Sequence, residues 1–299
     1  MRRLSIILKF SLAMTAWFGL TGAEAASRFD QSTTISTWLW DTATIVEEEQ
    51  QETVISNLVS HHVDVLQLQI QTDIQLEVYQ RFIRKAHAAG IAVHALDGSP
   101  YWADRNGPKL QQAFLSWLTT YQNQAAPEEK FKGIHLDVEP YGHDKYEQKK
   151  NMLWTNYQTM MLTFKDYTDR HDLVFEIDIP FWLYGIPYNN QYGKGNVAEW
   201  VCGHVKHITI MAYRDTAFLN DGVAGVAAAE MKLFRKYGVQ GVIAVETGKL
   251  PEGNDFVTFY GDGKEYMYGQ LEQVYQKYKK DPAFHGIAIH HYESWMEMK

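Results

Sequence analysis

Short apolar stretches alternate with amphipathic stretches along most of the chain. The apolar stretches are short and mostly rich in Val, Ile and Leu, and those over 63–70 and 134–139 alternate with polar residues, a pattern typical of strands. It predicts strands over 35–40, 63–70, 91–96, 134–139, 173–179, 207–212, 239–245 and 286–291. Apolar residues at helical spacing predict helices over 44–60, 73–89, 108–124, 144–170, 224–237 and 266–279. Strands joined in this way by helices indicate a parallel sheet.

Eight predicted strands favour a closed barrel over an open sheet. The sequence has no glycine-rich dinucleotide fingerprint and no phosphate-loop lysine motif, which argues against an open nucleotide-binding fold. We therefore predict an α/β protein with a single (β/α)8 TIM barrel as its catalytic domain over 35–299, after a polar leader over 26–34. The carboxyl ends of the strands are where such barrels carry their chemistry.

The first 25 residues predict an export signal. Arg2 and Arg3 precede an apolar run over 10–20, and Ala23-Glu24-Ala25 follows it. A charged start, a short apolar core and a small-residue cleavage site are typical of a signal peptide over 1–25. The run is shorter than the roughly 20 residues that a membrane-spanning helix needs. We expect a periplasmic or secreted protein with no stable membrane insertion.

Charge and cysteine content narrow the classes of partner. The formal net charge is −8, and residues 1–25 contribute +2 of it, so the remaining chain carries −10. This charge argues against a nucleic-acid partner, since nucleic acid is bound through basic surfaces. Cys202 is the sole cysteine, so no internal disulfide can form and the domain must be stabilised by its core.

The predicted strand over 134–139 carries the strongest chemical signal. Its apolar residues alternate with His135, Asp137 and Glu139, so these three side chains point the same way. Pro140 cannot donate to a ladder, and the strand should end before it. Asp and Glu are depleted in strands, so two carboxylates at the end of this one indicate a functional site. The alternative is an ordinary strand with a solvated polar face.

Other strand ends add carboxylates and aromatic rings to the same predicted rim. Aromatic faces stack on sugar rings, and carboxylates act as acid and base on the glycosidic oxygen. We expect His135 to be a satisfied core histidine rather than a ligand. Glu176 and Asp178 could be a buried hydrogen-bonded pair that holds the barrel together. The predicted substrate-binding residues are Trp40, Asp97, Trp102, Tyr141, Asp178, Trp182, Met211, Arg214, His290 and Trp295, and the loop over 181–196 is a possible substrate wall through Trp182, Tyr184, Tyr188 and Tyr192.

Two short motifs resemble those of the chitinase-type glycoside hydrolases of family 18. The strand-four motif of that family, D-G-x-D-x-D-x-E, is similar to Lys132-Gly133-Ile134-His135-Leu136-Asp137-Val138-Glu139. The glycine and the final Asp-x-Glu match, whereas Lys132 and His135 replace two aspartates that help to set the charge of the acid. The strand-six motif M-x-Y-D resembles Met211-Ala212-Tyr213-Arg214, with Asp215 displaced by one position.

The resemblance implies a retaining glycosidase without a cofactor or metal, acting on a poly- or oligosaccharide. Glu139 would be the general acid, and the 2-acetamido oxygen of the substrate would attack the anomeric carbon. Asp137 and Tyr213 would hold that acetamido group. Burial would raise the pKa of Glu139, as a general acid requires.

Three alternatives remain open. Glu246, at the end of the seventh predicted strand, could be a nucleophile paired with Glu139, with about 5–5.5 Å between the two carboxyl groups. A metal-dependent hydrolase could use Asp137, Glu139, Glu176 and Asp178, together with a histidine, as ligands of a hard divalent ion. A non-catalytic carbohydrate-binding barrel would account for the two missing aspartates.

Overall fold

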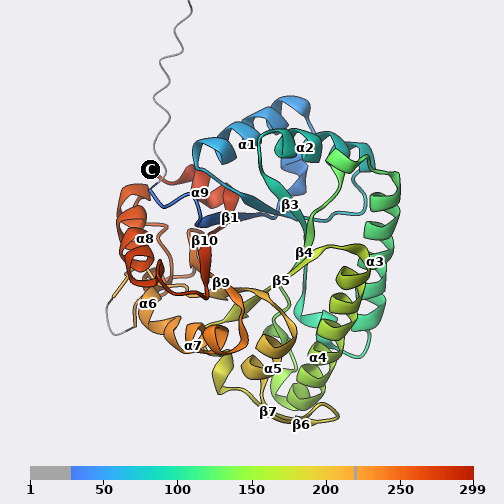
Figure 1. Cartoon of the computed structure of the whole chain (residues 1–299), viewed down its shortest axis with the longest axis vertical. Helices are drawn as coiled ribbons and strands as arrows, with labels where there is room; N and C mark the ends of the chain where they lie inside the picture. Colours follow the sequence, from blue (N-terminus) through green and yellow to red (C-terminus); the bar gives the residue numbers. More distant parts are fainter. Residues whose placement is uncertain (1–27, 219–220) are drawn as a thin grey trace, which may run out of the picture.

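The protein folds as a closed eight-stranded parallel barrel inside a ring of helices (Figure 1). The structure is a computed structural model and describes residues 28–218 and 221–299. The barrel strands are β1 (Thr34–Leu39), β2 (Val65–Gln69), β3 (Ala92–Asp97), β4 (Gly133–Leu136), β5 (Val174–Pro180), β8 (His207–Met211), β9 (Gln240–Glu246) and β10 (Phe284–His290). Around the barrel they run in the order β1-β10-β9-β8-β5-β4-β3-β2, so the predicted barrel is confirmed.

The helices follow the strands in the order that the sequence predicts. They are α1 (Glu48–Ser60), α2 (Leu76–Ala88), α3 (Gly107–Gln124), α4 (Tyr146–His171), α5 (Val197–His204), α6 (Val223–Val226), α7 (Ala228–Tyr237), α8 (Lys264–Tyr278) and α9 (Tyr292–Glu297). The predicted helix over 224–237 is divided into α6 and α7. Within the described ranges no helix is both long and apolar enough to cross a membrane, and the predicted signal peptide lies outside those ranges.

Two elements between β5 and β8 were not predicted. One is the antiparallel hairpin of β6 (Pro187–Asn190) and β7 (Gly193–Asn196), and the other is α5. The side chain of Asn196 caps α5 by accepting from the N–H groups of Ala198 and Glu199. An Asn N-cap with Glu199 in the first turn is a helix-start signal, and it could have identified α5 from the sequence.

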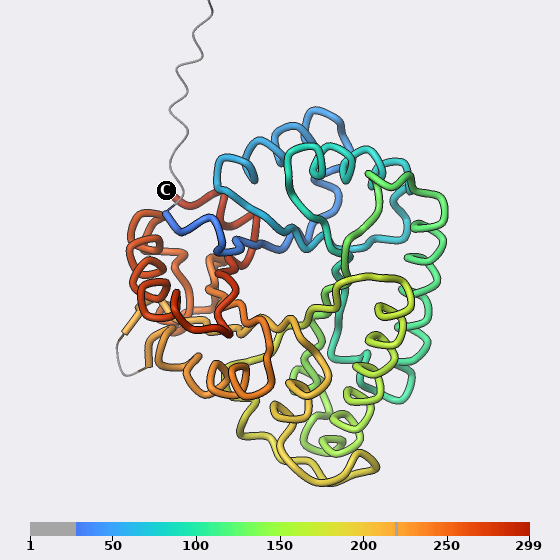
Figure 2. Tube along the Cα trace, viewed as in Figure 1, coloured from blue at the N-terminus to red at the C-terminus, as the bar shows by residue number. Residues whose placement is uncertain are grey.

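The two ends of the described chain lie side by side. Arg28 forms an ion pair with Glu265 of α8, and the Lys264 N–H donates to the carbonyl of Lys299. Figure 2 shows this contact where the blue and red ends of the tube meet. The first and last barrel strands, β1 and β10, pair directly beside it, from Thr34 opposite Gly286 to Thr37 opposite Ile289. The barrel is therefore closed by strand pairing as well as by contacts outside it.

The interior of the barrel is unusually polar. Branched apolar side chains dominate the inside of most barrels of this type. Here the buried inward positions include Gln67, His94, His135 and Asp178. Strand β4 ends at Leu136, three residues earlier than predicted, although the Asp137 N–H still donates to the Asp97 carbonyl of β3. The last two carboxylates of the motif therefore extend past the sheet at its carboxyl end.

Outside the barrel, Glu230 of α7 is a buried carboxyl group with a single partner. Its Oε1 accepts from the Tyr184 N–H at 3.3 Å, and its Oε2 has no partner in the described part of the chain. Burial raises the pKa of Glu230 to about 7. The pKa of Glu230 is higher in the folded state than in the unfolded state. Its contribution to the free energy of unfolding is therefore fully present below the unfolded pKa and is lost as pH rises through 7.

We predict that Glu230→Gln raises the free energy of unfolding at pH 8 by about 3 kcal/mol, because a shift of roughly 2.5 pH units is worth about this much. At pH 5 the two proteins should be about equally stable. Urea unfolding at both pH values measures the difference. Glu272→Gln, an exposed change on α8, should alter stability by less than about 0.5 kcal/mol at either pH. Equal effects of Glu230→Gln at pH 5 and pH 8 would contradict the prediction.

Candidate active site

Asp137 and Glu139 lie at the carboxyl end of the barrel, immediately after β4. Both residues are half-buried. The Tyr141 hydroxyl donates a hydrogen bond to Glu139 Oε1. The Trp182 ring packs edge-on against the Tyr141 ring, with 4.6 Å between the centroids. Glu139 therefore has one defined polar partner, and an aromatic wall stands beside it.

The pKa values of these two carboxyl groups are raised. For Glu139, burial is the main cause, the negative charge of Asp178 adds to it, and the Tyr141 hydrogen bond opposes it. For Asp137, burial raises the pKa well above its usual range, and Asp178 and Glu139 raise it further. Asp137 Oδ1 is buried without a hydrogen-bond partner among the described residues. This environment favours the protonated form of both groups.

Below Asp137, His135 connects Glu176 and Asp178. Its Nε2 lies 2.8 Å from Asp178 Oδ2, and its Nδ1 lies 3.2 Å from Glu176 Oε2. The sequence-based expectation of a buried Glu176–Asp178 pair is met through His135, because each carboxylate bonds to the histidine between them. The expectation that His135 is a satisfied core histidine also holds, since its side chain is fully buried.

Glu246 stands at the end of β9 with both carboxylate oxygens occupied. Oε1 accepts from the backbone N–H groups of Thr247, at 2.8 Å, and Gly248, at 2.5 Å. Oε2 lies 2.8 Å from His290 Nδ1. Burial would raise the pKa of Glu246, but the hydrogen bonds from His290 and Gly248 outweigh it and hold that pKa below its usual range.

The tautomer of His290 follows from its second partner. The Trp40 indole N–H points at His290 Nε2, at 2.9 Å. An indole nitrogen can only donate, so His290 Nε2 accepts and Nδ1–H is the group that donates to Glu246. Trp40, His290 and Glu246 thus form one hydrogen-bonded chain that runs from the end of β1 through β10 to β9.

Tyr213 and Trp38 are two further aromatic residues of the site. Tyr213 lies near the Glu246–His290 pair, and Trp38 bonds to Asp178. Both pack against the apolar interior residues Leu96, Val242, Ala244 and Ala288. Tyr213 is near His290, at 5.8 Å between ring centroids, and its pKa is raised well above the usual range by burial and by the surrounding carboxylates, first Glu246 and then Asp178. Trp38 donates from its indole N–H to Asp178 Oδ2 at 3.1 Å.

Several predicted substrate-binding residues do lie around this mouth. Tyr141 and Trp182 stand beside Glu139, Trp40 and His290 stand beside Glu246, and Asp178 lies beneath Asp137. Met211 is the last residue of β8, and Tyr213 follows two positions later. Asp97 accepts from the Gly98 N–H and from the Gln69 side chain, so it shapes the end of β3 next to Asp137.

Other predicted substrate-binding residues are engaged elsewhere. Trp102 is buried and stacks on Phe164 of α4, on the outer side of the barrel. Trp295 of α9 is fully buried and packs against His61, just after α1. Arg214 forms an ion pair with Asp221 and lies over the Phe181 and Phe256 rings. Contacts with a ligand at the mouth would require Trp102 and Trp295 to leave the core.

The loop over 181–196 is only in part a wall of the mouth. Trp182 stands at the mouth, but the hairpin that follows runs along the outside of α4 (Figure 2). Tyr192 bonds to Thr159, and Asn190 bonds to Gln158, both on α4. The expectation that Tyr188 and Tyr192 are stacking platforms at the mouth is therefore wrong, because the hairpin packs on the helices.

His94 is a site residue that the sequence reasoning missed. It lies on β3 with its Nδ1 2.8 Å from Glu176 Oε2. A histidine between Val93 and Ala95, at an inward position of an apolar strand, was the available signal. The sequence reasoning took Glu176 as part of a buried pair or as a metal ligand, and its two histidine partners connect it to Asp178 beneath Asp137.

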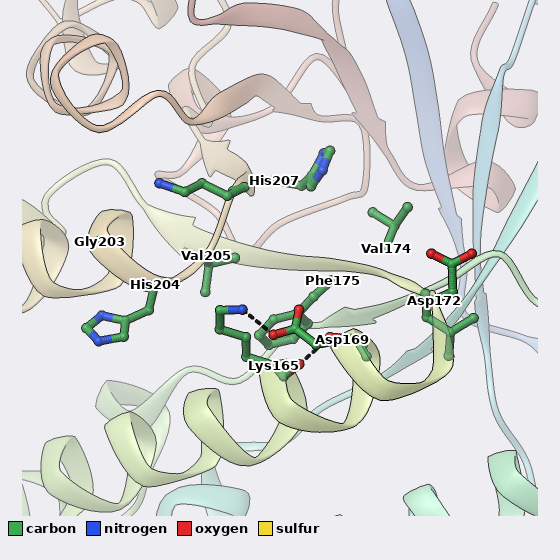
Figure 3. Close-up of a pocket in the computed structure, with 12 residues that line it drawn as sticks. Lys165, Asp169, Asp172, Val174, Phe175, Gly203, His204, Val205 and His207 are labelled. Atoms are coloured by element: carbon green, nitrogen blue, oxygen red, sulfur yellow. Dashed lines mark hydrogen bonds and ion pairs between the residues drawn. The ribbon is translucent and has the colours of Figure 1, made fainter.

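A separate cavity of about 400 Å³ lies at the opposite end of the barrel (Figure 3). It is formed by the end of α4, the end of α5 and the residues that lead into β5 and β8, among them Asp172, Val205 and His207. Lys165 and Asp169 pair with each other across its floor. These residues lie at the amino-terminal end of the strands, where barrels of this class carry stability rather than chemistry.

A metal-binding arrangement is not found in the described part of the chain. In 28–218 and 221–299 no group of three or more His, Cys, Asp or Glu side chains is placed to hold an ion. Of the carboxylates that a metal-dependent hydrolase would use, Glu176 and Asp178 are bonded to His135, and Glu139 accepts from the Tyr141 hydroxyl.

Comparisons with known proteins show a fold that is shared with chitinases. No protein-family model and no curated protein matches the chain by sequence. A chitinase from Bacteroides thetaiotaomicron superposes on 88% of this chain and 90% of its own, with a TM-score of 0.54 and 9% identity. The spore cortex-lytic enzyme SleL from Bacillus megaterium QM B1551 superposes on 86% of this chain and 70% of its own, with a TM-score of 0.54 and 8% identity. The expected likeness to a chitinase-type barrel is confirmed at the level of the fold.

Gly98, directly after β3, provides a test of how tightly the end of β4 is held. A Cβ at this position would lie 1.9 Å from the Asp137 carbonyl oxygen. We predict that Gly98→Ala displaces Asp137 and lowers the free energy of unfolding by about 3 kcal/mol, as expected for severe overpacking.

Urea unfolding measures this loss, and Gly269→Ala is the matched control. Gly269 is exposed within α8, and a Cβ there would meet nothing within 4 Å. The control should gain about 0.5–1 kcal/mol from improved helix propensity. If Gly98→Ala were as stable as the native protein, the close approach of β3 to Asp137 would be disproved.

Proposed function

We propose that the protein is an exported glycoside hydrolase in which Glu139 is the general acid. The observation that supports this best is the environment of Glu139. It is a half-buried carboxyl group with a raised pKa at the carboxyl end of a barrel strand, beside aromatic rings. A general acid needs a carboxyl group that keeps its proton near neutral pH.

The proposed substrate is a poly- or oligosaccharide that contains 2-acetamido sugars. Asp137 lies next to Glu139 with its pKa raised and with an unpaired buried oxygen, so it is suited to donate a hydrogen bond to an amide group of the substrate. Tyr213 supplies a second hydroxyl in the same region. The fold likeness to a protein named as a chitinase agrees with this choice of substrate.

The substrate-assisted mechanism is favoured over one in which Glu246 is the nucleophile. Three hydrogen bonds stabilise the Glu246 carboxylate and reduce its nucleophilicity, since both its oxygens are occupied. Asp137, by contrast, is free to orient an acetamido oxygen toward the anomeric carbon. In this mechanism Glu139 protonates the leaving oxygen, and Glu246 with His290 fixes the wall of the site.

A carbohydrate-binding barrel without catalysis is the second candidate. It is favoured by the replacement of two motif aspartates with Lys132 and His135. In that case the Glu139→Gln variant would bind sugar as tightly as the native protein, and the native protein would release no product. A turnover assay separates the two functions.

We predict that the native protein hydrolyses fluorogenic N-acetylglucosamine oligomers and that Glu139→Gln lowers kcat by about 10²–10⁴-fold, the usual share of a general acid. Gluco- and galacto-configured substrates without the acetamido group should not be cleaved. Glu246→Gln is the comparison for the mechanism and should retain more activity than Glu139→Gln. Cleavage of plain hexosides, with Glu246→Gln and Glu139→Gln equally inactive, would instead establish Glu246 as the nucleophile.

Tyr141→Phe tests the protonation state of Glu139. The Tyr141 hydroxyl stabilises the Glu139 carboxylate, so its removal raises the pKa of Glu139 further. The acid form then persists to higher pH, and we predict that the basic limb of the kcat/KM profile moves upward. A profile that moves downward, or does not move in a folded variant, would contradict this assignment of Glu139.

A further inference from the structure

His135 has a carboxylate oxygen at each of its two ring nitrogens. The distances are 2.8 Å from Nε2 to Asp178 and 3.2 Å from Nδ1 to Glu176. The ring is fully buried, so no water competes for these contacts. Ionised carboxylates only accept hydrogen bonds, and a histidine that donates from both nitrogens is an imidazolium.

The strand register and two further donors fix this bridge. His135 of β4 and Glu176 of β5 are direct partners in the parallel ladder. His94 Nδ1 lies 2.8 Å from the same Glu176 oxygen, and the Trp38 indole N–H donates to the same Asp178 oxygen that faces His135. Neither carboxylate can turn away from His135 without losing a second bond.

The negative charge of Asp178 acts on the neighbouring carboxyl group of Asp137. Asp178 Oδ1 and Asp137 Oδ1 are both buried, and neither has a hydrogen-bond partner among the described residues. Of the charged groups around Asp137, Asp178 raises its pKa most, ahead of Glu139, and the opposing effect of the His135 charge is smaller than either. A fixed negative charge at Asp178 therefore favours a proton on Asp137.

We propose that His135 is a permanently protonated positioning residue, which holds Asp178 as an anion so that Asp137 stays protonated beside Glu139. In this chain Asp178 on β5 and His135 on β4 would then set the charge of the site. His135 stands at one of the two motif positions where an aspartate is replaced, and Lys132 stands at the other. The consequence for catalysis rests on the proposed function, whereas the charge of His135 does not.

The groups that face this bridge come from every side of the barrel. Apart from Glu176 and Asp178, they are His94 on β3, Asp137 and Glu139 after β4, Tyr157 on α4, His207 on β8 and Tyr213 after it, and His285 and His290 on β10. Burial alone would lower the pKa of His135, but the charge of Asp178 and the bonds to both carboxylates raise it to about 10. The imidazolium should persist through the whole range in which a glycosidase works.

The first experiment is a ¹⁵N NMR titration of the full chain labelled at its histidines. We expect the His135 signal to show two protonated ring nitrogens from pH 5 to pH 9, with no titration. It is identified by its loss in His135→Gln or, if that variant does not fold, by its shift in Glu176→Gln. A single protonated nitrogen, or a midpoint near 6.5, would overturn the proposal.

The second experiment links this charge to the site through Glu176→Gln. This variant removes one anion from His135 and leaves every group at the mouth in place. The pKa of His135 should fall into the measurable range. Above that midpoint a neutral His135 no longer holds the negative charge on Asp178, so the proton that Asp137 carries passes to Asp178. The basic limb of the pH–rate profile should therefore move down to the same midpoint that NMR gives for His135. A structural role alone would lower kcat equally at all pH values, and that result would overturn the positioning role.

His285→Gln is the matched control. His285 also lines the amino-terminal cavity of about 190 Å³ that borders Glu176, but its ring bonds to Thr34 and not to the bridge. It should leave both the His135 signal and the pH profile unchanged.

The role of His135 can be tested even if the protein proves not to be a glycoside hydrolase. If no substrate is turned over, binding of the N-acetylglucosamine pentamer replaces the rate, and calorimetry should show Glu176→Gln losing affinity as pH rises through the His135 midpoint. Unchanged affinity across that midpoint would overturn the link between His135 and Asp137.

Discussion

The bridge from Glu176 through His135 to Asp178 is the interaction on which the interior of this barrel depends. It places two carboxylates and a histidine in a space that other barrels fill with branched apolar side chains. Burying an unpaired charge costs several kcal/mol, and removing one partner of a buried pair is strongly destabilising. The ladder pairing of β4 with β5 holds His135 opposite Glu176, and the Trp38 and His94 donors complete the coordination of the two carboxylates.

This bridge divides the polar groups of the barrel into two layers. In the lower layer each carboxylate is hydrogen-bonded by His135 and by a second donor from another strand. In the upper layer Asp137 and Glu139 have few partners, and their pKa values are raised mainly by burial. Such a contrast between satisfied and unsatisfied carboxyl groups is what separates structural charges from candidate acids.

Glu246 illustrates the same distinction on the other side of the mouth. It is as well placed on its strand as Glu139, but two backbone N–H groups and His290 stabilise its charged form. The Trp40 indole fixes His290 in the tautomer that makes this bond. Two carboxylates at equivalent ends of barrel strands thus differ in protonation because their hydrogen-bond partners differ.

The sequence by itself determined the eight strands, most of the helices and the strand ends at which Asp137, Glu139, Tyr213 and Glu246 stand. Period-two alternation and proline stops are local properties, so they can be recognised in one segment at a time. Only the tertiary structure decided which of these side chains meet. The bridge at His135 joins residues 41 and 43 positions apart, and His94 lies 82 positions from Glu176. Likewise, only the packed fold shows that Trp102 and Trp295 face the helices and that the 187–196 hairpin lies outside the mouth. Local patterns give the direction of a side chain relative to its own strand, whereas its partners and its burial depend on which other strands close the barrel around it.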